Sequence, residues 1–311
     1  MYLDIMKTRH TTLQKLKRIW PLYILLLPGL LSILIFNYGP MYGAMIAFKD
    51  YKIADGFINS NWVGLKWFDK FVSGYDFKLL LTNTLRISIY SLIVNSLVRI
   101  ICSLSINSLR QQALKKIIQT ITYLPHFIST VVMVGILIRF FNPSYGVISK
   151  IIQFFGGTDR DLMGYASAAP HIYVWSDVWQ NAGWSTILFL SALASVDPQL
   201  HEAAIVDGAT ITQRIFHIDL PALVPTIVIC LILDCGNIMN VGHTKMLLMQ
   251  NSLNISTTEI ISTYVYNIGI SSATPKYSYA TAIGLMNSIV NFILVVLVNG
   301  ICRRLNETSL W

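Results

Sequence analysis

Long apolar runs constrain this chain more than any other feature of its sequence. A helix needs about 20 predominantly apolar residues to cross a bilayer. Six runs come close to or exceed that length, at residues 20–38, 79–109, 117–141, 171–195, 222–246 and 279–301. Charged residues make up only 12% of the chain, about half of what a soluble domain carries. The sequence therefore predicts an all-α membrane protein with six transmembrane helices.

The basic residues indicate how these helices are oriented. A formal net charge of +8 would suit a nucleic-acid partner, but many of the lysines and arginines flank the apolar runs. Basic residues near helix ends favour the cytosolic side. This rule places a basic tail at residues 1–19, a turn at 110–116 and a second tail at 302–311 in the cytosol. We therefore predict two cytosolic termini and no nucleic-acid partner.

The remaining segments follow from that orientation. Residues 20–38 are expected to form the first transmembrane helix, a retained anchor, because no small-residue cleavage site follows it as in a signal peptide. Residues 39–78 are expected to form an extracellular loop, and residues 79–301 a core with five transmembrane helices. The dipeptide Pro125-His126 interrupts the third of the six predicted spans.

Two predicted spans carry polar side chains that would be costly against lipid. In the fourth span, spacings of three and four residues place such side chains on one helix face: Asp177, Gln180, Asn181 and Trp184. In the fifth span they step by three along a slowly drifting face: Asp234, Asn237 and Asn240. Both faces could line one cavity, where amides and carboxylates beside tryptophan suit a sugar.

Hydrogen bonding between helices is the alternative role for these polar groups. For Asp177 and Asp234 the sequence supports the two roles about equally. We favour the interhelical role for single amides elsewhere in the spans: Asn83, Asn95, Asn287 and Asn291. Arg86 and Arg99 lie in the second span and are expected to reach the membrane interface or to face protein.

A short polar stretch, residues 197–221, separates the fourth and fifth spans. Pro198 suits a helix start, where a missing N–H is tolerated, and good helix formers follow it. Gly208 then breaks the helix as a C-cap or a hinge. Apolar residues at helical spacing predict a second short helix that Pro221 ends. The docking face of this bent structure is expected to consist of small residues: Ala203, Ala204 and Ala209.

This stretch resembles the EAA loop of ATP-binding-cassette (ABC) importer permeases. The family pattern is Glu-Ala-Ala, three residues, Gly, nine residues and Ile-x-Leu-Pro. Here Glu202-Ala203-Ala204, Gly208 and Ile218-Asp219-Leu220-Pro221 follow it with every spacer at the expected length. The resemblance implies a cytosolic coupling helix that contacts an ATPase. The contact residues it implies are Glu202, Ala203, Ala204, Asp207, Gly208 and Ala209.

Nearly the whole chain is similar to an oligosaccharide and polysaccharide uptake branch of these permeases, called LplB-like, and more distantly to the maltose importer permease. Stretches that carry this likeness include residues 42–50, 123–129, 236–242 and 309–311. The resemblance implies a type I importer permease fold in the bacterial cytoplasmic membrane. It also implies a second permease, two cytosolic ATPase subunits, an external binding lipoprotein and a carbohydrate substrate.

No catalytic or nucleotide-binding motif is visible in the sequence. There is no Gly-x-x-x-x-Gly-Lys-Ser/Thr stretch, no His-Glu-x-x-His and no recognisable serine nucleophile elbow. The four cysteines lack metal-binding spacing with histidine. We therefore expect no enzyme activity, metal or cofactor in this chain, with ATP and Mg²⁺ bound by the partner ATPase. A secondary transporter not driven by ATP is the alternative function, and a membrane-embedded enzyme is a weaker one.

Overall fold

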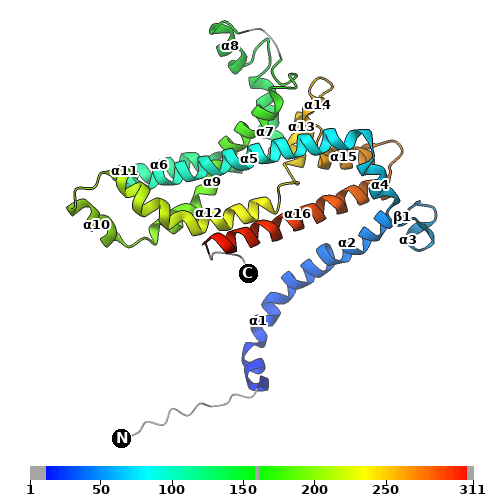
Figure 1. Cartoon of the computed structure of the whole chain (residues 1–311), viewed down its shortest axis with the longest axis horizontal. Coiled ribbons are helices and arrows are strands. Elements are labelled where there is room, and N and C mark those ends of the chain that lie inside the picture. Colours follow the sequence, from blue (N-terminus) through cyan, green and yellow to red (C-terminus); the bar gives the residue numbers. More distant parts are fainter. Residues whose placement is uncertain (1–11, 158–160, 307–311) are drawn as a thin grey trace.

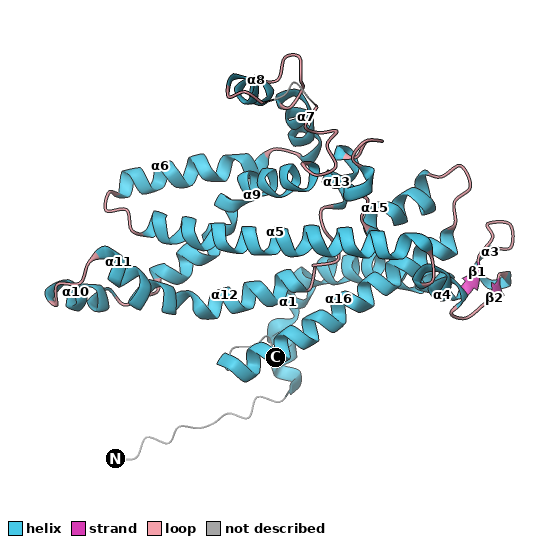
Figure 2. Ribbon diagram, turned by 45° about the horizontal axis from the view of Figure 1, so that its top comes forward, coloured by secondary structure: helices cyan, strands magenta, loops and turns pink. Residues whose placement is uncertain are grey.

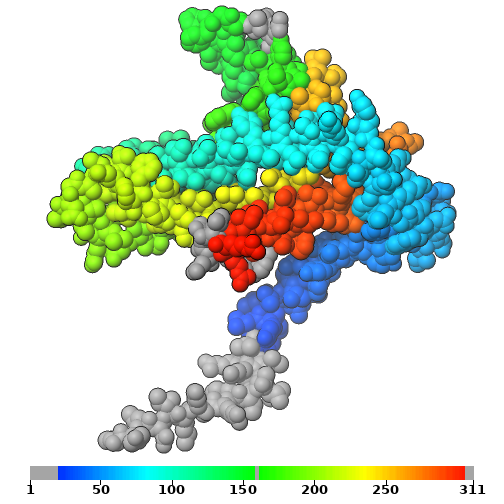
Figure 3. All heavy atoms as spheres, in the orientation of Figure 1, coloured from blue at the N-terminus to red at the C-terminus, as the bar shows by residue number. Residues whose placement is uncertain are grey.

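The computed structural model describes residues 12–157 and 161–306, most of which are helical (Figure 1). At the N-terminal end, four helical segments follow one another without a break: α1 (Thr12–Ile33), η1 (Leu34–Tyr38), α2 (Gly39–Met41) and η2 (Tyr42–Phe48). The apolar part of α1 lies apart from the body and has no buried residue (Figure 3). The apolar helix runs from Trp20 to Phe48 and so extends past the predicted end at Tyr38.

A strand pair and two short helices occupy much of the predicted extracellular loop. β1 (Lys49–Asp50) pairs antiparallel with β2 (Asn61–Trp62), and Lys49 lies opposite Trp62. α3 (Gly56–Asn59) lies between the strands, and α4 (Lys66–Val72) follows them. The Tyr51 N–H donates to the Ser278 Oγ at 2.8 Å. This bond fastens the region to the start of the last helix.

Long helices form the body of the fold: α5 (Tyr75–Asn107), α9 (Ala169–Ala194), α12 (Leu220–Cys235) and α16 (Tyr277–Asn306). α5 packs along α9, and α12 contacts α5, α9 and α16 (Figure 2). One buried apolar cluster includes Ile87 and Val174, and another includes Phe189 and Leu223. Polar residues of α5 and α9 line a cavity beside these apolar clusters.

The predicted interruption of the third span at Pro125-His126 is confirmed. α6 (Gln112–Tyr123) continues into η3 (Leu124–Phe127), and α7 (Thr130–Phe140) leaves at 97° to it. α8 (Val147–Phe154) extends the arm that projects from the body (Figure 1). α6 packs against α9 at Gly183, where a Cβ would lie 2.1 Å from the carbonyl oxygen of Thr122. Only glycine permits that approach.

The connection between α9 and α12 corrects one prediction. α10 (Pro198–Val206), α11 (Ile211–Arg214) and the π-helical η4 (Ile215–Asp219) form this connection. Pro221 was expected to end a short helix, but the helix is continuous from Ile211 to Cys235. In η4 the Leu220 N–H donates to the carbonyl of Ile215. Proline has no backbone N–H to donate, and a wider turn of this kind lets the helix continue without that hydrogen bond.

The fifth predicted span ends earlier than its apolar run. The helix stops at Cys235, because Gly236 and Asn237 are weak helix formers. A turn and loop cover residues 236–242, and α13 (His243–Met249) begins a separate helix. The predicted end at Met246 is therefore wrong. Three short elements complete the segment before α16: α14 (Ile255–Thr258), α15 (Ile261–Tyr266) and η5 (Asn267–Ser271).

Within the described residues, four helices are long and apolar enough to cross a membrane, at 20–48, 75–107, 211–235 and 277–304. The bent pair formed by α6 and α7 makes a fifth span if it crosses as one unit. The predicted fourth span does form a helix, the 26-residue α9. Its polar residues lower its hydropathy, so it does not belong to this apolar group.

Candidate functional site

A cavity of about 350 Å³ lies among α5, α9 and the end of α12. α5 contributes a polar row at spacings of three and four residues: Ser88, Ser91, Asn95 and Arg99. α9 contributes residues spaced by four: Tyr173, Asp177, Asn181 and Ser185. Asp234 and Asn237 line the third side. Two helices therefore turn polar faces toward one space, as their spacing requires.

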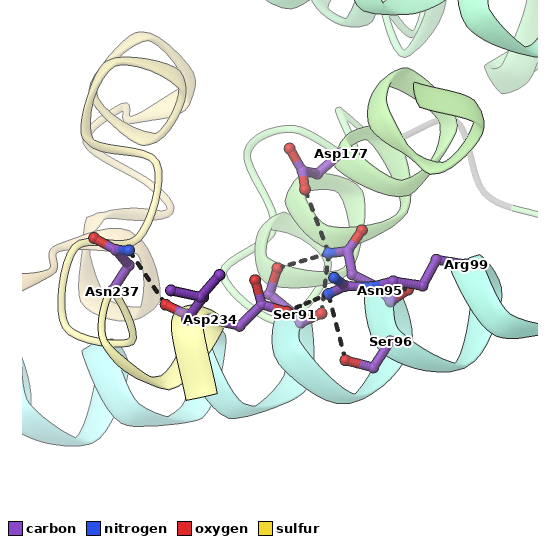
Figure 4. Close-up of polar contacts among 8 residues, drawn as sticks. Ser91, Asn95, Ser96, Arg99, Asp177, Asp234 and Asn237 are labelled. Carbon is purple, nitrogen blue, oxygen red and sulfur yellow. Dashed lines mark hydrogen bonds and ion pairs between the residues drawn. The ribbon is translucent and has the colours of Figure 1, made fainter. Parts of the chain in front are cut away.

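An ion pair joins two walls of this cavity. The Arg99 guanidinium of α5 contacts the Asp234 carboxylate of α12 (Figure 4). The Arg99 side chain is only 12% exposed, and it also donates to the backbone carbonyl of Asn95 at 3.3 Å. Away from bulk water each charge needs the other, because an unpaired charge carries a large desolvation cost. The pair therefore helps to set the separation of α5 and α12.

Two amides hold the Asp177 carboxylate on the α9 wall. The Asn181 Nδ2 donates to Oδ1 at 2.9 Å. The Asn95 Nδ2 of α5 donates to Oδ2 at 3.3 Å (Figure 4). Asn95 thus makes an interhelical hydrogen bond, as predicted, and it also lines the cavity. The Asp177 side chain keeps 26% of its surface exposed, so it still faces the space between the helices.

A second cavity of about 410 Å³ adjoins the first. Four residues line both cavities: Tyr173, Asp177, Asn181 and Gly242. The other polar residues that line the second cavity come from the bend after α6 and from α9 and α13: His126, Ser129, Thr130, Gln180, His243, Thr244 and Lys245. Together the two cavities present hydroxyl, amide, carboxylate, imidazole and ammonium groups to one polar space.

Lys245, on α13, is a buried cation beside the second cavity. Its side chain is 5% exposed, and its Nζ lies 3.8 Å from the Asp177 Oδ1. The same Nζ lies 5.3 Å from the centre of the Tyr173 ring. α13 lies outside the long apolar helices. Burial lowers the pKa of Lys245 to about 8, and the Asp177 carboxylate opposes that shift.

The other two predicted residues of α9 contact the bend after α6. The His126 Nδ1 lies 2.9 Å from the Asn181 Oδ1, and the His126 ring stacks on Trp184 with centroids 4.6 Å apart. Trp184 lines a third cavity, which also includes Arg99. Gln180 is buried, and its Nε2 donates to the carbonyl of Ile128 at 2.8 Å. Gln180 therefore fastens α9 to the bend.

The predicted polar face of the fifth span comes together only in part. Asp234 and Asn237 line the first cavity, but Asn240 lines neither of the two adjoining cavities. Its Oδ1 accepts from the Asn287 Nδ2 of α16 at 2.9 Å. The reason is that the helix ends at Cys235, so a three-residue step no longer marks one face beyond that point.

Arg99 and Lys245 line the cavities, although neither was predicted to do so. A signal for Arg99 was available, because polar residues recur every four positions in an otherwise apolar span: Ser91, Asn95 and Arg99. Lys245 had a weaker signal, a single lysine near the end of a predicted span. Its contact with Asp177 depends on residues 236–242, which carry α13 back toward α9.

The predicted helix, glycine bend and helix form within residues 197–221. Pro198 is the first residue of α10, and the Asp197 side chain caps it by accepting from the Gln199 N–H at 3.0 Å. Gly208 follows the helix with a φ of +80°. That left-handed conformation favours glycine, which has no Cβ to clash with the backbone.

Local hydrogen bonds fix this bend on both sides. The N–H groups of Gly208 and Ala209 donate to the carbonyls of Ile205 and Ala204 at 3.0 and 2.8 Å, the two bonds of a Schellman cap. On the other side, Thr210 caps α11 in a reciprocal capping box with the residue three positions later. The bend therefore needs no distant part of the chain to hold its shape.

α10 exposes apolar and charged side chains together. Its exposed large apolar residues are Leu200, Ile205 and Val206, the last at 86%. Glu202, Ala203 and Asp207 are exposed as well. Ala204 and Ala209 are partly buried and line a small cavity against α11. The three alanines therefore do not form one outward face, because the Schellman cap turns two of them toward the next helix.

A polar contact joins α10 to the long helices. The His201 Nε2 lies 3.4 Å from the Asp219 Oδ1, to which the Asn107 Nδ2 at the end of α5 also donates at 3.4 Å. Asp219 is only 5% exposed, and a buried carboxylate needs such partners. These contacts join α10 to the end of α5 and to η4, which leads into α12.

Residues 95–307 match the family described as "Binding-protein-dependent transport system inner membrane component". The chain belongs to this family. The matched region contains most of the cavity residues and the whole of the 197–221 stretch. The cavity and the exposed helix therefore belong to a permease subunit of a transport system.

Individual relatives agree with the family assignment. Protein LplB of Bacillus subtilis (strain 168) is 43% identical over 95% of this chain and 92% of its own length. The polygalacturonan/rhamnogalacturonan transport system permease protein YteP of the same organism is 38% identical, over 93% and 90%. A chain of a bacterial alginate ABC transporter, crystallised with an alginate pentasaccharide-bound periplasmic protein, superposes with a TM-score of 0.86 at 35% identity.

That superposition covers 96% of this chain and 99% of the other. The predicted resemblance to LplB-like sugar-importer permeases and the predicted type I importer permease fold are thus confirmed. This permease is an inner-membrane subunit of an ABC importer, and relatives such as YteP are named as permeases of sugar-polymer transport systems.

Proposed function

We propose that this permease forms half of the translocation path of an ATP-driven importer for oligosaccharides or polysaccharide fragments. The observation that carries the proposal is a polar cavity linked by the long helices α9 and α12 to an exposed, locally braced α10. The relatives favour this substrate class, since one is named for polygalacturonan and rhamnogalacturonan and a solved neighbour imports the acidic polysaccharide alginate.

The proposed topology has six spans with both termini in the cytosol of a bacterium. α9 is the fourth span, and the helices around it shield its polar face from lipid, where unpaired polar groups would be costly. The full importer contains a second permease, two cytosolic ATPase subunits and an external solute-binding lipoprotein. In this assembly the ATPase subunits bind ATP and Mg²⁺.

The proposed power stroke passes through α10. ATP binding closes the ATPase pair, and α10, seated on one ATPase subunit, moves as a rigid body because caps brace both sides of the Gly208 bend. Glu202 makes a charged contact with the ATPase, and Ala203 permits close approach. The helices then switch access around the central cavity, as in other alternating-access transporters.

Inside the path, the sugar exchanges water for protein hydrogen bonds. Asp177, Asn181 and Asn237 offer acceptors and donors to its hydroxyl groups, and Trp184 offers a ring face to its C–H groups. Asp234 acts mainly through its ion pair with Arg99. Breaking and remaking that pair is a step by which α5 and α12 can separate.

The test is ATP-driven uptake by the complete importer in proteoliposomes. Labelled oligosaccharide should accumulate only with ATP on the ATPase side, and uptake should survive ionophores that collapse ion gradients. Gly208→Leu should uncouple ATP hydrolysis from uptake while the protein still inserts. Uptake that follows an ion gradient without ATP would support a secondary transporter instead, and wild-type uptake by Gly208→Leu would reject the lever.

The proposed orientation of the chain in the membrane can be measured separately. In the permease expressed without its ATPase subunits, and with its native cysteines replaced by serine, a cysteine at Ala203 should react with a membrane-impermeant reagent only from the cytosolic side. The matched position is Ser272, between η5 and α16, where a cysteine should react only from outside. Labelling of both positions from one side would overturn the six-span arrangement.

A further inference from the structure

The ammonium group of Lys245 has no hydrogen-bond partner within the described part of the chain, although its side chain is 95% buried. A lysine Nζ carries three donor hydrogens and no acceptor. Burying these donors away from water without hydrogen-bond acceptors costs free energy. A group in this condition is poised to bind an acceptor that the protein itself does not supply.

Asp177 does not supply that acceptor. Its nearer oxygen lies 3.8 Å from the Lys245 Nζ, beyond the usual hydrogen-bond range of about 2.7–3.2 Å. Both Asp177 oxygens already accept from amides, one from Asn181 and the other from Asn95. The carboxylate therefore lowers the electrostatic cost of a charged lysine without occupying its donors.

The neighbouring cation is in the opposite condition. Arg99 lines the adjoining cavity, but Asp234, Ser96 and the carbonyl of Asn95 occupy its guanidinium. Of the two cations that line the adjoining cavities, Lys245 alone combines burial with free donors among the described residues. An anionic group in this space would therefore find free donors on Lys245.

The lining of the second cavity describes the rest of the ligand. Thr130, Thr244 and Asn181 present hydroxyl and amide groups that pair with sugar hydroxyls, and His243 adds an imidazole. A charge-assisted bond from an ammonium to a carboxylate is roughly twice as strong as a neutral one. A carboxylate on a sugar ring thus fits Lys245 better than another hydroxyl does.

We propose that Lys245 recognises the carboxylate of a uronic-acid residue as an acidic oligosaccharide passes through the path. This inference rests on the proposed function and names the charge of its substrate. A hydrogen bond from the Nζ replaces the hydrogen bonds to water that the sugar carboxylate loses on entering the cavity. While no sugar is bound, the Asp177 carboxylate stabilises the charged form of Lys245. Neutral oligosaccharides lack the group that completes this contact.

The test compares the equilibrium binding of an acidic trisaccharide, trigalacturonate, with that of a neutral one, galactotriose. Binding is measured to the purified complex of two permeases and two ATPase subunits in lipid nanodiscs. Lys245→Met should weaken trigalacturonate binding about tenfold, because one charge-assisted hydrogen bond is lost, and should change galactotriose binding less than twofold. Lys245→Arg should keep most of the preference. Lys150→Met, on the exposed face of α8, is the matched control and should change neither.

A second variant separates recognition from packing. Asp177→Asn keeps the size of the side chain but removes a carboxylate that repels the incoming sugar carboxylate. At pH 6, where Lys245 stays charged without Asp177, trigalacturonate should therefore gain affinity relative to galactotriose. Equal weakening of both sugars by Lys245→Met would overturn the inference, as would an unchanged ratio in Asp177→Asn. A wild-type complex that prefers galactotriose, or binds neither sugar, would also overturn it. ATP-driven uptake of a neutral oligosaccharide would in that case leave the proposed function standing.

Discussion

The bend around Gly208 and the cavity around Asp177 are held together in opposite ways. Hydrogen bonds between residues at most five positions apart fix the bend. The cavity depends on contacts between distant parts of the chain: Asn95 and Asp177 are 82 positions apart, and Arg99 and Asp234 are 135 apart.

Because of this difference, the bend and the cavity should respond differently when the helices move. A locally braced bend keeps its geometry when its surroundings change, which suits an element that transmits force. A cavity held by contacts between helices changes shape as soon as those helices shift, which suits a site that must open and close. The following changes should separate the two behaviours.

The largest effect is expected from breaking the ion pair at the cavity. Arg99→Met leaves the Asp234 carboxylate, whose side chain is 34% exposed, unpaired between α5 and α12. The expected loss of about 2–3 kcal/mol lies between the values typical of exposed and of buried pairs. Thermal unfolding of the purified complex should show the loss. Arg99→Met combined with Asp234→Leu should recover most of it, because no charge is then left alone. A single variant as stable as wild type would show that solvent already screens the pair.

A smaller effect is expected at the bend. Gly208→Val forces a β-branched residue into a left-handed conformation, which costs about 1–2 kcal/mol. Apart from Gly208 and its chain neighbours, no heavy atom of the described residues lies within 4 Å of the position that a Cβ would occupy, so the cost should come from the backbone alone. Hydrogen exchange should quicken in α10 and α11 but not in α5. Gly208→Asn is the control, since asparagine tolerates this conformation, and protection loss that reached α5 would contradict a locally held bend.

Removal of the next cap should weaken the second half of the bend. Thr210→Ala deletes the side-chain acceptor of the capping box at the start of α11, at a typical cost of about 1 kcal/mol. Amide exchange over residues 211–214 reports the change, and Thr210→Ser should retain protection. Equal exchange in the alanine and serine variants would mean that packing against α12, rather than the cap, holds this turn.

The smallest effect is expected at Asn240. Its side chain accepts from Asn287 outside the adjoining cavities, and the Asn287 Nδ2 keeps a second acceptor in the carbonyl of Met239 at 3.3 Å. Asn240→Ala should therefore change stability by about 0.5 kcal/mol or less and leave oligosaccharide binding within about twofold. Asn181→Ala, inside the cavity, should weaken binding about tenfold. Similar losses in the two variants would place Asn240 in the path after all.

Several elements could be predicted because their causes are local. The start of α10 at Pro198, the break at Gly208 and the bend after Tyr123 all follow from the backbone preferences of proline and glycine. The polar face of α9 follows from spacing along one helix. The extent of α12 could not be read in this way, since an apolar run continues past Cys235 while the helix does not.

By itself, the sequence determined that this chain is a membrane protein, that α9 has a polar face and that residues 197–221 bend at a glycine. These features depend on composition, on the spacing of polar residues and on backbone preferences, all of which act over a few residues. Only the tertiary structure decided that Asn240 turns to α16, that Ala204 and Ala209 face α11, and that Lys245 reaches Asp177. Those outcomes depend on where helices end and how they pack. Side chains far apart in sequence become neighbours only when the whole set of helices is in place.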